Sequence, residues 1–224
     1  MIGKINRFER KWVYKNFDHL SLISELIKSN LFFNKQYPNR KVNSIYFDDI
    51  HYSSIIENLD GISEKKKIRI RWYGQKEQLT NPILEIKSKK GFETTKETYE
   101  ISELDGLKFN NLKNLELIKN TINSKNKTKN IIYPVLTTNY EREYFISNNE
   151  QIRATVDYDL KSIKIKNFSQ IELIKNFASL CILELKYSTN IDKFVRQNLK
   201  EITLRLSRNS KFINSAFETP SYFS

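Results

Sequence analysis

The sequence is poor in the residues that build disulfides, histidine metal sites and nucleophilic triads. Its 224 residues include one cysteine and two histidines. The single Cys181 excludes an intramolecular disulfide framework, and with no histidine near it in the sequence we interpret it as an inert buried thiol. His19 and His51 give a histidine-based metal site or a Ser/His triad little to build on.

Long apolar runs and repeats are also missing. No stretch approaches the length of a membrane span, and the N-terminus lacks the apolar run of a signal peptide. The sequence shows no internal repeat, no Pro-rich linker and no long low-complexity tract. We therefore expect a soluble, cytoplasmic protein made of a single domain over residues 1–224.

Positive charge is in excess. The chain carries 38 Lys and Arg against 26 Asp and Glu, a net charge of +12. Such an excess favours anionic partners such as phosphates, nucleic acid or acidic lipid. The abundance of Lys, Asn and Ile is also what a coding bias toward AT-rich codons would produce. The arrangement of the charges is therefore more informative than their total.

Four short stretches alternate charged and apolar residues with a period of two. In a β-strand, this pattern places the charged side chains on one face and the apolar ones on the other. The stretches are 7–12, 67–72, 84–87 and 182–186, and a Glu stands two residues from a Lys at Glu9/Lys11, Glu85/Lys87 and Glu184/Lys186. On an open surface such an ion pair contributes only about 0–1 kcal/mol. If the strands curl into a closed barrel, the charged faces would instead form a lumen for a polyanion with a bound cation.

Periodicity and turn signals predict an α+β fold, an eight-stranded antiparallel β tunnel barrel with peripheral helices. Gly74 and Gly91 fall where turns are needed, and Asn148-Asn149 is typical of a hairpin. The expected strands lie near 5–14, 42–48, 65–74, 82–89, 94–101, 136–147, 151–160 and 180–188. Neighbouring strands are expected to pair antiparallel.

Helical spacing is found between and after the strands. Asp18 can cap a helix whose apolar residues share one face, and the segment 52–59 predicts a short helix that Gly61 closes. A third helix is expected from about 102 to 124. A fourth is expected within 192–206, followed by a short terminal helix.

Phosphate chains need many Arg and Lys donors spread along a path, with Arg supplying forked contacts. The candidate phosphate-binding residues are Lys11, Arg69, Arg71, Lys87, Arg142, Arg153, Lys186 and Lys211. The candidates for holding a nucleotide are Arg69, Arg71, Tyr140 and Arg142. Tyr140 could stack on a base or line the wall, and we favour the wall.

Acidic residues among these cations have two predicted roles. Like charges at close range repel, so interspersed acids make a cluster of cations less unfavourable. An acid beside bound phosphates can also hold Mg²⁺ or Mn²⁺. Glu184 is the first candidate for this metal ion, and Glu9 and Asp157 follow it.

Eight segments, taken in order, resemble a known family. They are RFERK (7–11), SIYFD (44–48), IRIRWY (68–73), LEIK (84–87), YER (140–142), RATVD (153–157), LELK (183–186) and SKF (210–212). In this order they resemble the VTC domain, the polyphosphate polymerase domain of the vacuolar transporter chaperone. That domain is a member of the triphosphate tunnel metalloenzyme (CYTH-like) superfamily, and the resemblance covers nearly the whole chain.

The resemblance implies a tunnel barrel that binds a triphosphate or polyphosphate with a divalent metal. In the polymerase, the terminal phosphoryl group of ATP passes to the end of a growing polyphosphate chain. Carried over position by position, the implied phosphate ligands are Lys11, Arg69, Arg71, Lys87, Arg142, Arg153 and Lys211, and the implied metal ligand is Glu184. Phosphoryl transfer chiefly needs alignment and charge neutralisation, so the shortage of nucleophiles is no obstacle.

The chain also departs from its relatives. Arg7 stands where the tunnel hydrolases carry the first Glu of their Glu-x-Glu-x-Lys motif, which argues against the two-metal hydrolases of the superfamily. Lys193 and Arg196 lie near further basic residues of the family without a secure alignment. The membrane helices and the SPX sensor of eukaryotic relatives are absent, so a membrane-protein partner for delivering the polymer is left open.

Three functions are therefore compared. The first is a polymerase acting on ATP or another nucleoside triphosphate, with inorganic polyphosphate as its polymer. The second is a tripolyphosphatase or nucleoside triphosphatase of the same fold, and the third is a non-catalytic sensor that binds polyphosphate or RNA. No specific nucleic acid is expected as a partner, because Trp12 and Trp72 have the parity of the outer face and leave no base-stacking platform.

Overall fold

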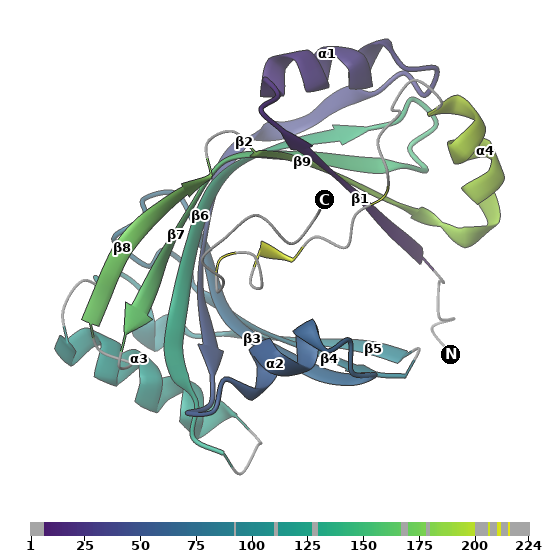
Figure 1. Ribbon diagram of the computed structural model, residues 1–224. Helices are drawn as coiled ribbons and strands as arrows, with labels where there is room; N and C mark the ends of the chain where they lie inside the picture. The colour runs from purple at the N-terminus through teal and green to yellow at the C-terminus, as the bar shows by residue number, and fades with distance from the viewer. Residues whose placement is uncertain are drawn as a thin grey trace. The chain divides into compact units, whose positions relative to one another are not determined.

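The computed structural model describes residues 7–91, 93–109, 112–126, 130–166, 170–177 and 180–199, and the single positions 206, 210, 211 and 215. Its strands are β1 (Arg7–Lys15), β2 (Asn34–Asp48), β3 (Glu64–Tyr73), β4 (Ile83–Lys90), β5 (Glu93–Glu100), β6 (Tyr133–Ile146), β7 (Arg153–Lys166), β8 (Gln170–Phe177) and β9 (Leu180–Ser188). Its helices are α1 (His19–Lys28), α2 (Ser53–Leu59), α3 (Leu112–Lys125) and α4 (Asp192–Asn198). Figure 1 shows these elements.

The strands form one sheet with the order β1-β9-β7-β6-β2-β3-β4-β5, and β8 pairs with β7 off this path. The described pairings of β1 with β9, β2 with β3, β3 with β4, β4 with β5 and β7 with β9 are all antiparallel. The eight strands of the main path are the eight predicted ones. The α+β class and the peripheral helices are therefore confirmed. The predicted pairing of strands that follow one another in the chain holds within β2 to β5, but it is wrong for β1, which pairs with β9, and for β5 and β6, which are not neighbours in the sheet.

Three segments of the sheet were not predicted from the sequence, and one of them is the end of β7, which reaches Lys166 although the prediction ended at 160. Another is β8, for which no strand was predicted. The third is the first half of β2, which begins at Asn34 although the prediction began at 42. Because its side chains up to Lys41 are exposed or half-buried on both faces, this half has no apolar alternation to detect. Pro38 within it is typical of a strand edge, because proline has no N–H for the ladder.

The chain divides into two compact units that share the strands β2, β6 and β7. The first unit contains residues 1–40, 140–160 and 177–209, and the second contains 41–139, 161–176 and 210–224. Each unit is described by itself below.

In the first unit, α1 and α4 pack on the apolar faces of the strands. Leu22 and Leu26 of α1 and Val195 of α4 join one buried cluster with Leu183 of β9 and Val156 of β7. Trp12 belongs to the same cluster. The apolar residues of the alternating stretches therefore face the helices, and the charged residues face the other way.

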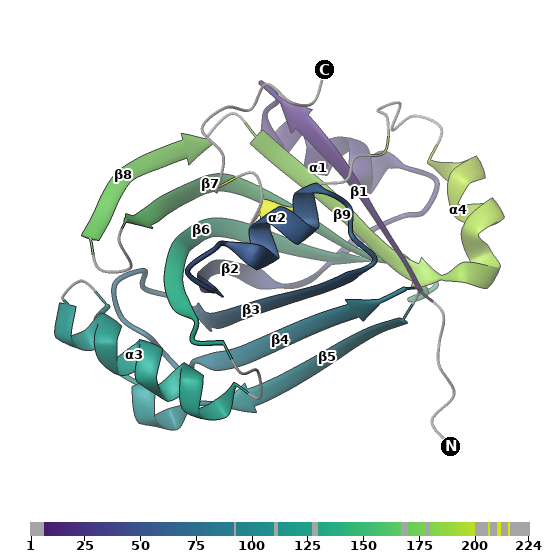
Figure 2. The same ribbon diagram turned by 60° about the horizontal axis from the view of Figure 1, so that its bottom comes forward.

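The second unit is built in the same way around α3. Leu115, Ile118 and Ile122 of this helix pack against Ile70 and Trp72 of β3. Figure 2 shows β3, β4 and β5 side by side with α3 nearby. Trp72, like Trp12, therefore lies in a core on the face opposite to the charged residues, as its parity predicted.

The helix ends follow local chemistry, and one prediction needs correction. Asp18 caps α1 as expected, because its Oδ2 accepts a hydrogen bond from the Ser21 N–H at 2.9 Å. The single helix predicted from 102 to 124 is wrong: a 3₁₀ turn, Ser102–Leu104, is separated from α3. Gly106 lies between them at φ +76°, a left-handed conformation that a continuous helix does not contain.

The last predicted helix is only partly described. α4 ends at Asn198, and most of the expected continuation toward 206 lies outside the described residues, as does most of the terminal helix. Among the described residues, no helix is long and apolar enough to cross a membrane.

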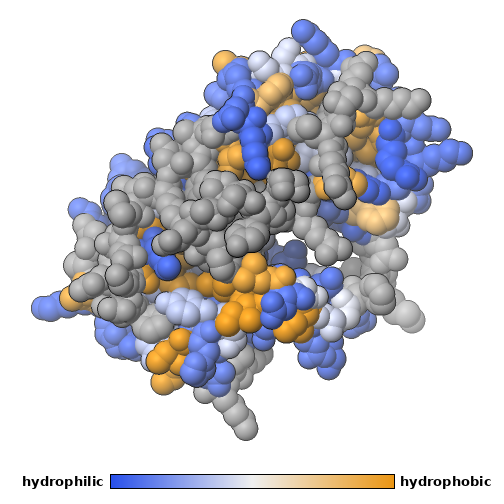
Figure 3. All heavy atoms as spheres, in the orientation of Figure 1, coloured by the Kyte–Doolittle hydropathy of each residue, from blue (hydrophilic) through white to orange (hydrophobic). Residues whose placement is uncertain are grey.

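An apolar patch lies on and around α2. Ile50, Ile56, Leu59 and Ile62 keep between 44% and 59% of their surface exposed. Figure 3 shows hydrophobic atoms gathered on this part of the second unit. The opposite side of α2 is buried, because Ile55 packs against Tyr46 of β2.

Asp48 explains how α2 is attached to the end of β2. Its side chain is 1% exposed. It accepts hydrogen bonds from the backbone N–H groups of Asp49, Ser54 and Ile55 at 2.9, 2.9 and 3.0 Å. The last residue of the SIYFD segment therefore serves the fold, because it pairs N–H groups that the helix leaves unsatisfied.

We predict that Asp48→Ala lowers the free energy of unfolding by about 2–4 kcal/mol, because it leaves buried N–H groups without an acceptor. Urea denaturation measures this loss. The exposed Asp60 at the other end of α2 provides the control, and Asp60→Ala should change the free energy by less than about 0.5 kcal/mol. Equal effects of the two variants would contradict the capping role.

Candidate functional site

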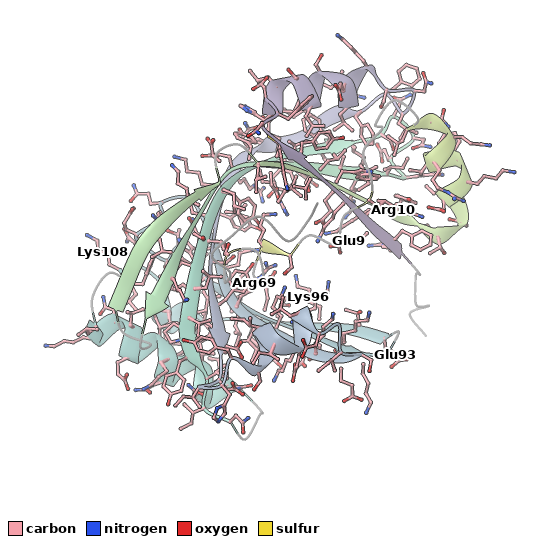
Figure 4. The ribbon with its side chains drawn as sticks, viewed as in Figure 1. Glu9, Arg10, Arg69, Glu93, Lys96 and Lys108 are labelled. Carbon is pink, nitrogen blue, oxygen red and sulfur yellow. The ribbon has the colours of Figure 1, made fainter. Side chains whose placement is uncertain are left out.

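The charged face of the first unit is built from rows of residues across β1, β9 and β7. In the first of these rows Lys11 lies opposite Glu184, which lies opposite Thr155. The Lys11 Nζ is 3.2 Å from Oε2 of Glu184 and 2.8 Å from Oε1 of Glu9. Two carboxylates thus converge on one ammonium group. In Figure 4, Glu9 and its neighbour Arg10 are labelled on β1.

Glu184 is the centre of this face. It is 7% exposed, and its Oε1 also lies 2.7 Å from Nζ of Lys186. Burial by itself would raise the pKa of Glu184, but the charges of Lys11, Lys186 and Arg142 lower this pKa well below its usual range. Glu184 is therefore held as an anion among cations.

A second buried ion pair involves Asp157, which lies two residues beyond Thr155 on β7. Arg142 donates from Nε and Nη2 to the two oxygens of Asp157 at 2.5 and 2.8 Å. Its guanidinium carbon lies 5.4 Å from the ring centre of Tyr140. Burial opposes the charge of Arg142, but Asp157 raises its pKa well above the usual value. Tyr140 is 2% exposed, so it lines the wall and is not an open stacking surface.

Arg153 and Lys186 lie opposite each other on β7 and β9, nearer the strand ends. Both are exposed. The structure therefore brings Lys11, Arg142, Arg153, Lys186 and the three acidic candidates onto one charged face of the first unit.

In the second unit, Glu85 has the corresponding central position. Arg69 donates to its Oε2 from Nε and Nη2 at 2.7 and 2.6 Å. Lys96 donates to its Oε1 at 2.8 Å, and Nη1 of Arg71 lies 3.8 Å from the same oxygen. Figure 4 labels Arg69 and Lys96, which reach Glu85 from β3 and β5. One carboxylate thus holds three cations.

Arg71 has an unsatisfied donor. Within the described part of the chain its Nε is buried without a hydrogen-bond partner, and the same is true of the Ser44 hydroxyl. Ser44 lies directly opposite Arg71 in the pairing of β2 with β3, so the two groups share the charged face. A buried polar group without a partner is unfavourable by about 1–3 kcal/mol, and such groups often mark a binding site.

Tyr46 of β2 contacts Arg69 of β3 through a hydrogen bond. Its hydroxyl accepts a hydrogen bond from Nη1 of Arg69 at 3.1 Å. Burial by itself raises the pKa of Tyr46. The charges of Arg69, Lys67 and Arg71 have a larger opposite effect and lower this pKa to about 8. The charged face therefore stabilises anions strongly enough to ease ionisation of a buried phenol.

The two remaining predicted cations lie on the same unit. Lys87 is exposed on β4, opposite Lys67 and Lys96. Lys211 is half-buried, and its neighbour Ser210 accepts a hydrogen bond from Nζ of Lys67 at 2.9 Å. The segment that carries Lys211 is thus attached to β3 at the charged face.

Sequence reasoning missed Ser44, Tyr46 and Lys96 and the central role of Glu85. A signal for Lys96 existed, because the turn at Gly91 sets the pairing that places Lys96 opposite Lys87.

Arg196 does not join the charged face: it binds Asp192 at 3.1 Å, the same residue that Arg10 holds at 2.6 Å. This network attaches α4 to β1 instead.

Only some of the predicted metal ligands fit a divalent ion. Glu9 and Glu184 already surround one cation, the ammonium of Lys11, and Mg²⁺ or Mn²⁺ is often held by one or two carboxylates plus substrate phosphates. Both oxygens of Asp157 are engaged by Arg142. Among the described residues, no three His, Cys, Asp or Glu side chains form a metal-binding group. Glu9 and Glu184 therefore fit the ion best.

Cys181 does not contribute to the site. It is buried in the core cluster of the first unit, and its thiol lies 3.2 Å from the backbone oxygen of Phe17. Burial raises its pKa to about 11. The thiol is inert at neutral pH, as interpreted from the sequence.

Comparison with known proteins identifies relatives at the level of family and fold. The model of a family described as the VTC domain matches residues 6–217. A Bacillus halodurans protein described as a candidate adenylate cyclase is 16% identical, with 97% of this chain and 100% of that chain covered and a TM-score of 0.54. A Hippeastrum candidate adenylyl cyclase, described as having a dominant triphosphatase activity, is 13% identical, with 95% and 97% covered and a TM-score of 0.51. No curated protein sequence matches significantly.

The ion pairs of Glu85 make stability depend on pH. Burial raises the pKa of this carboxyl, but Arg69 and Arg71 lower it from the ordinary 4.5 to about 2. A carboxyl with a lowered folded-state pKa stabilises the protein above its unfolded-state pKa, and the stabilisation is lost as pH falls from about 4.5 toward 2. The shift corresponds to about 3 kcal/mol.

We therefore expect the difference in unfolding free energy between the wild type and Glu85→Gln to shrink as pH falls. The difference should decrease by up to about 3 kcal/mol between pH 5 and pH 2. Urea denaturation at a series of pH values measures it. Glu64→Gln, at an exposed ion pair with Lys90, is the control and should show a small difference at every pH. A pH-independent difference for Glu85→Gln would refute the assignment.

Proposed function

Because the chain belongs to the VTC domain family of the triphosphate tunnel metalloenzyme superfamily, we propose that it is a metal-dependent polyphosphate polymerase. In this proposal the terminal phosphoryl group of ATP passes to the end of a growing polyphosphate chain. ATP and inorganic polyphosphate are the proposed ligands, and the cytoplasm is the proposed location.

The observation that carries the proposal is the unsatisfied polar pair of Ser44 and Arg71. Glu85 already occupies Arg69 and Lys96, yet Nε of Arg71 and the hydroxyl of Ser44 lack partners among the described residues. A phosphate oxygen is an acceptor that both groups could use, and a charged acceptor forms a stronger hydrogen bond than a neutral one. The charged face of the second unit is thus suited to bind a phosphate group.

Each unit carries proposed phosphate ligands on its own charged face. Those of the first unit are Lys11, Arg142, Arg153 and Lys186, and those of the second are Arg69, Arg71, Lys87 and Lys211. Glu184, with Glu9, would hold Mn²⁺ or Mg²⁺, which supplies further positive charge to the phosphate oxygens. Asp157 would act through Arg142, because its two oxygens fix the guanidinium.

The reaction needs no proton transfer to a protein base. An oxygen of the acceptor's terminal phosphate attacks the γ-phosphorus of ATP with its own electron pair, and a new P–O bond forms. The P–O bond between the γ-phosphorus and the bridging oxygen breaks, and its electron pair leaves with ADP. The cations serve to align the two phosphate chains and to neutralise their charge.

The acidic residues favour this transfer over hydrolysis. Water must lose a proton to become part of a phosphate, and a carboxylate with a lowered pKa is a weak base for that proton. The pKa values of Glu85, Glu9 and Glu184 are all lowered, in spite of burial, by neighbouring cations. A phosphate acceptor is already an anion at neutral pH and needs no such base.

Incubation of the purified protein with ATP and Mn²⁺ tests the proposal. Polymer resolved on a gel, together with release of ADP, supports the polymerase. Free phosphate without polymer would replace it with the triphosphatase. Binding of polyphosphate without any turnover would replace it with the sensor.

We predict that Arg71→Ala lowers the rate of polymer formation at least about 100-fold, as expected when a charged contact to the transferred group is lost. Arg71→Lys should recover only part of this rate, because an ammonium cannot make the forked contact of a guanidinium. Gel analysis of initial rates gives both values. Lys90→Ala, at an exposed cation on β4, is the matched control and should keep the wild-type rate. A wild-type rate in Arg71→Ala would refute its role.

A further inference from the structure

An aromatic cluster lies in the first unit, where β2 and β6 are neighbours in the sheet. The rings of Tyr37 on β2 and Tyr144 on β6 meet edge to face, with 5.9 Å between their centres and an angle of 81°. The guanidinium carbon of Arg40 lies 5.7 Å from the centre of the first ring and 5.6 Å from that of the second. These three side chains form an aromatic platform.

The aromatic platform is open to solvent. Tyr37 keeps 48% of its surface exposed, Arg40 is exposed, and Tyr144 is half-buried. Tyr140, on the same strand as Tyr144, is 2% exposed. A flat ligand can therefore reach Tyr37 and Arg40, whereas Tyr140 offers it no surface.

The core does not explain why these rings are gathered. Among the described residues, neither Tyr37 nor Tyr144 belongs to a hydrophobic cluster. Tyr37 also lies in the first half of β2, where the side chains are exposed or half-buried on both faces. An exposed ring beside a guanidinium offers a flat and weakly hydrated surface, on which another flat ring can stack.

Strand β6 relates the aromatic platform to the proposed phosphate ligands. Tyr144 is two residues from Arg142, so both side chains point to the same face at a spacing of about 6.6 Å along the strand. Both oxygens of Asp157 hold the guanidinium of Arg142 in place. A ligand that fits this order has a flat ring at one end and phosphates at the other. A nucleoside triphosphate has this form, whereas an inorganic phosphate chain does not.

The chemistry of the aromatic platform selects among flat ligands. Nucleobases stack on tyrosine rings and on the planes of arginine guanidinium groups. The charge of Arg40 attracts an anionic ligand and disfavours a cationic one. The two fused rings of a purine also cover more of such a surface than the single ring of a pyrimidine. A purine nucleotide therefore fits best.

From these observations we infer that Tyr37, Arg40 and Tyr144 bind the purine base of a nucleoside triphosphate, and that Tyr37 makes the protein prefer this ligand to inorganic tripolyphosphate. The role of this nucleotide as the phosphoryl donor rests on the proposed polymerase function. Stacking of the base is a separate property, and it is measurable without turnover.

The test is calorimetric binding of a non-hydrolysable ATP analogue, compared with inorganic tripolyphosphate, which has three phosphates and no base. Loss of an aromatic ring that stacks on a base weakens binding by about tenfold or more. Tyr37→Ala should therefore weaken binding of the ATP analogue about tenfold and leave tripolyphosphate within about twofold of the wild type. Tyr37→Phe keeps the ring and should bind both ligands within about twofold of the wild type.

Phe32→Ala is the matched control, because it removes an exposed ring of the first unit that lies outside the aromatic platform. It should leave binding of both ligands within about twofold of the wild type. Thermal melting of each variant checks the fold. An unchanged affinity of Tyr37→Ala for the ATP analogue, or an equal loss for both ligands, would overturn the inference.

The wild type provides a second measurement that does not depend on how well a variant folds. Because a purine stacks over a larger area, the ATP analogue should bind at least about threefold more tightly than the matching UTP analogue. Equal affinities for these two analogues would contradict purine stacking on the aromatic platform.

The base site and the polymerase function fail differently. If Tyr37→Ala selectively weakens binding of the ATP analogue but no polymer is ever formed from ATP, the base site stands and the polymerase function fails. If polymer is formed but Tyr37→Ala binds the ATP analogue as the wild type does, the function stands and the base site is wrongly assigned.

Discussion

A buried carboxylate surrounded by cations is the interaction on which the charged faces depend. Glu85 binds Arg69 and Lys96 directly in the second unit, and Glu184 binds Lys11 and Lys186 in the first. Without these acids, the cations would repel one another and favour solvent. With them, the cations are held on the sheet at fixed positions, and some of their donors are left for a ligand.

The same arrangement explains the proposed chemistry. The carboxylates are stabilised as anions, so they are weak bases and suit a reaction that needs charge neutralisation more than proton removal. Arg71 differs from Arg69 because, within the described part of the chain, its Nε has no hydrogen-bond partner. Arg69 is bound to Glu85 and Tyr46, whereas Arg71 is the arginine for which we propose a contact with phosphate.

Much of this could be predicted from sequence because the period of a strand is two. That period placed Arg69 and Arg71 on one face and Ile70 and Trp72 on the other, and the structure has the same division. It also predicted the face of Glu184. The same period does not predict which residues of two paired strands lie opposite each other. Lys11 lies opposite Glu184, which is more than 170 residues away in the chain, and this pairing depends on the tertiary structure.

The missed features have physical reasons. The first half of β2 is exposed on both faces and has no apolar period, and Gly106 separates a turn from α3 through its left-handed conformation. Glu85 is important because it binds three cations from the two neighbouring strands. None of these three cations belongs to the LEIK segment. Short motifs predict which face a residue occupies, whereas its partners depend on the strands beside it.

A crystal structure with bound tripolyphosphate and Mn²⁺ tests the central claim most directly. The account predicts phosphate oxygens within hydrogen-bond distance of Arg71 on β3 and of Lys11 on β1, with Glu85 and Glu184 still buried beside their cations. Tripolyphosphate bound elsewhere, with Arg71 and Lys11 left in contact only with their carboxylates, would contradict it.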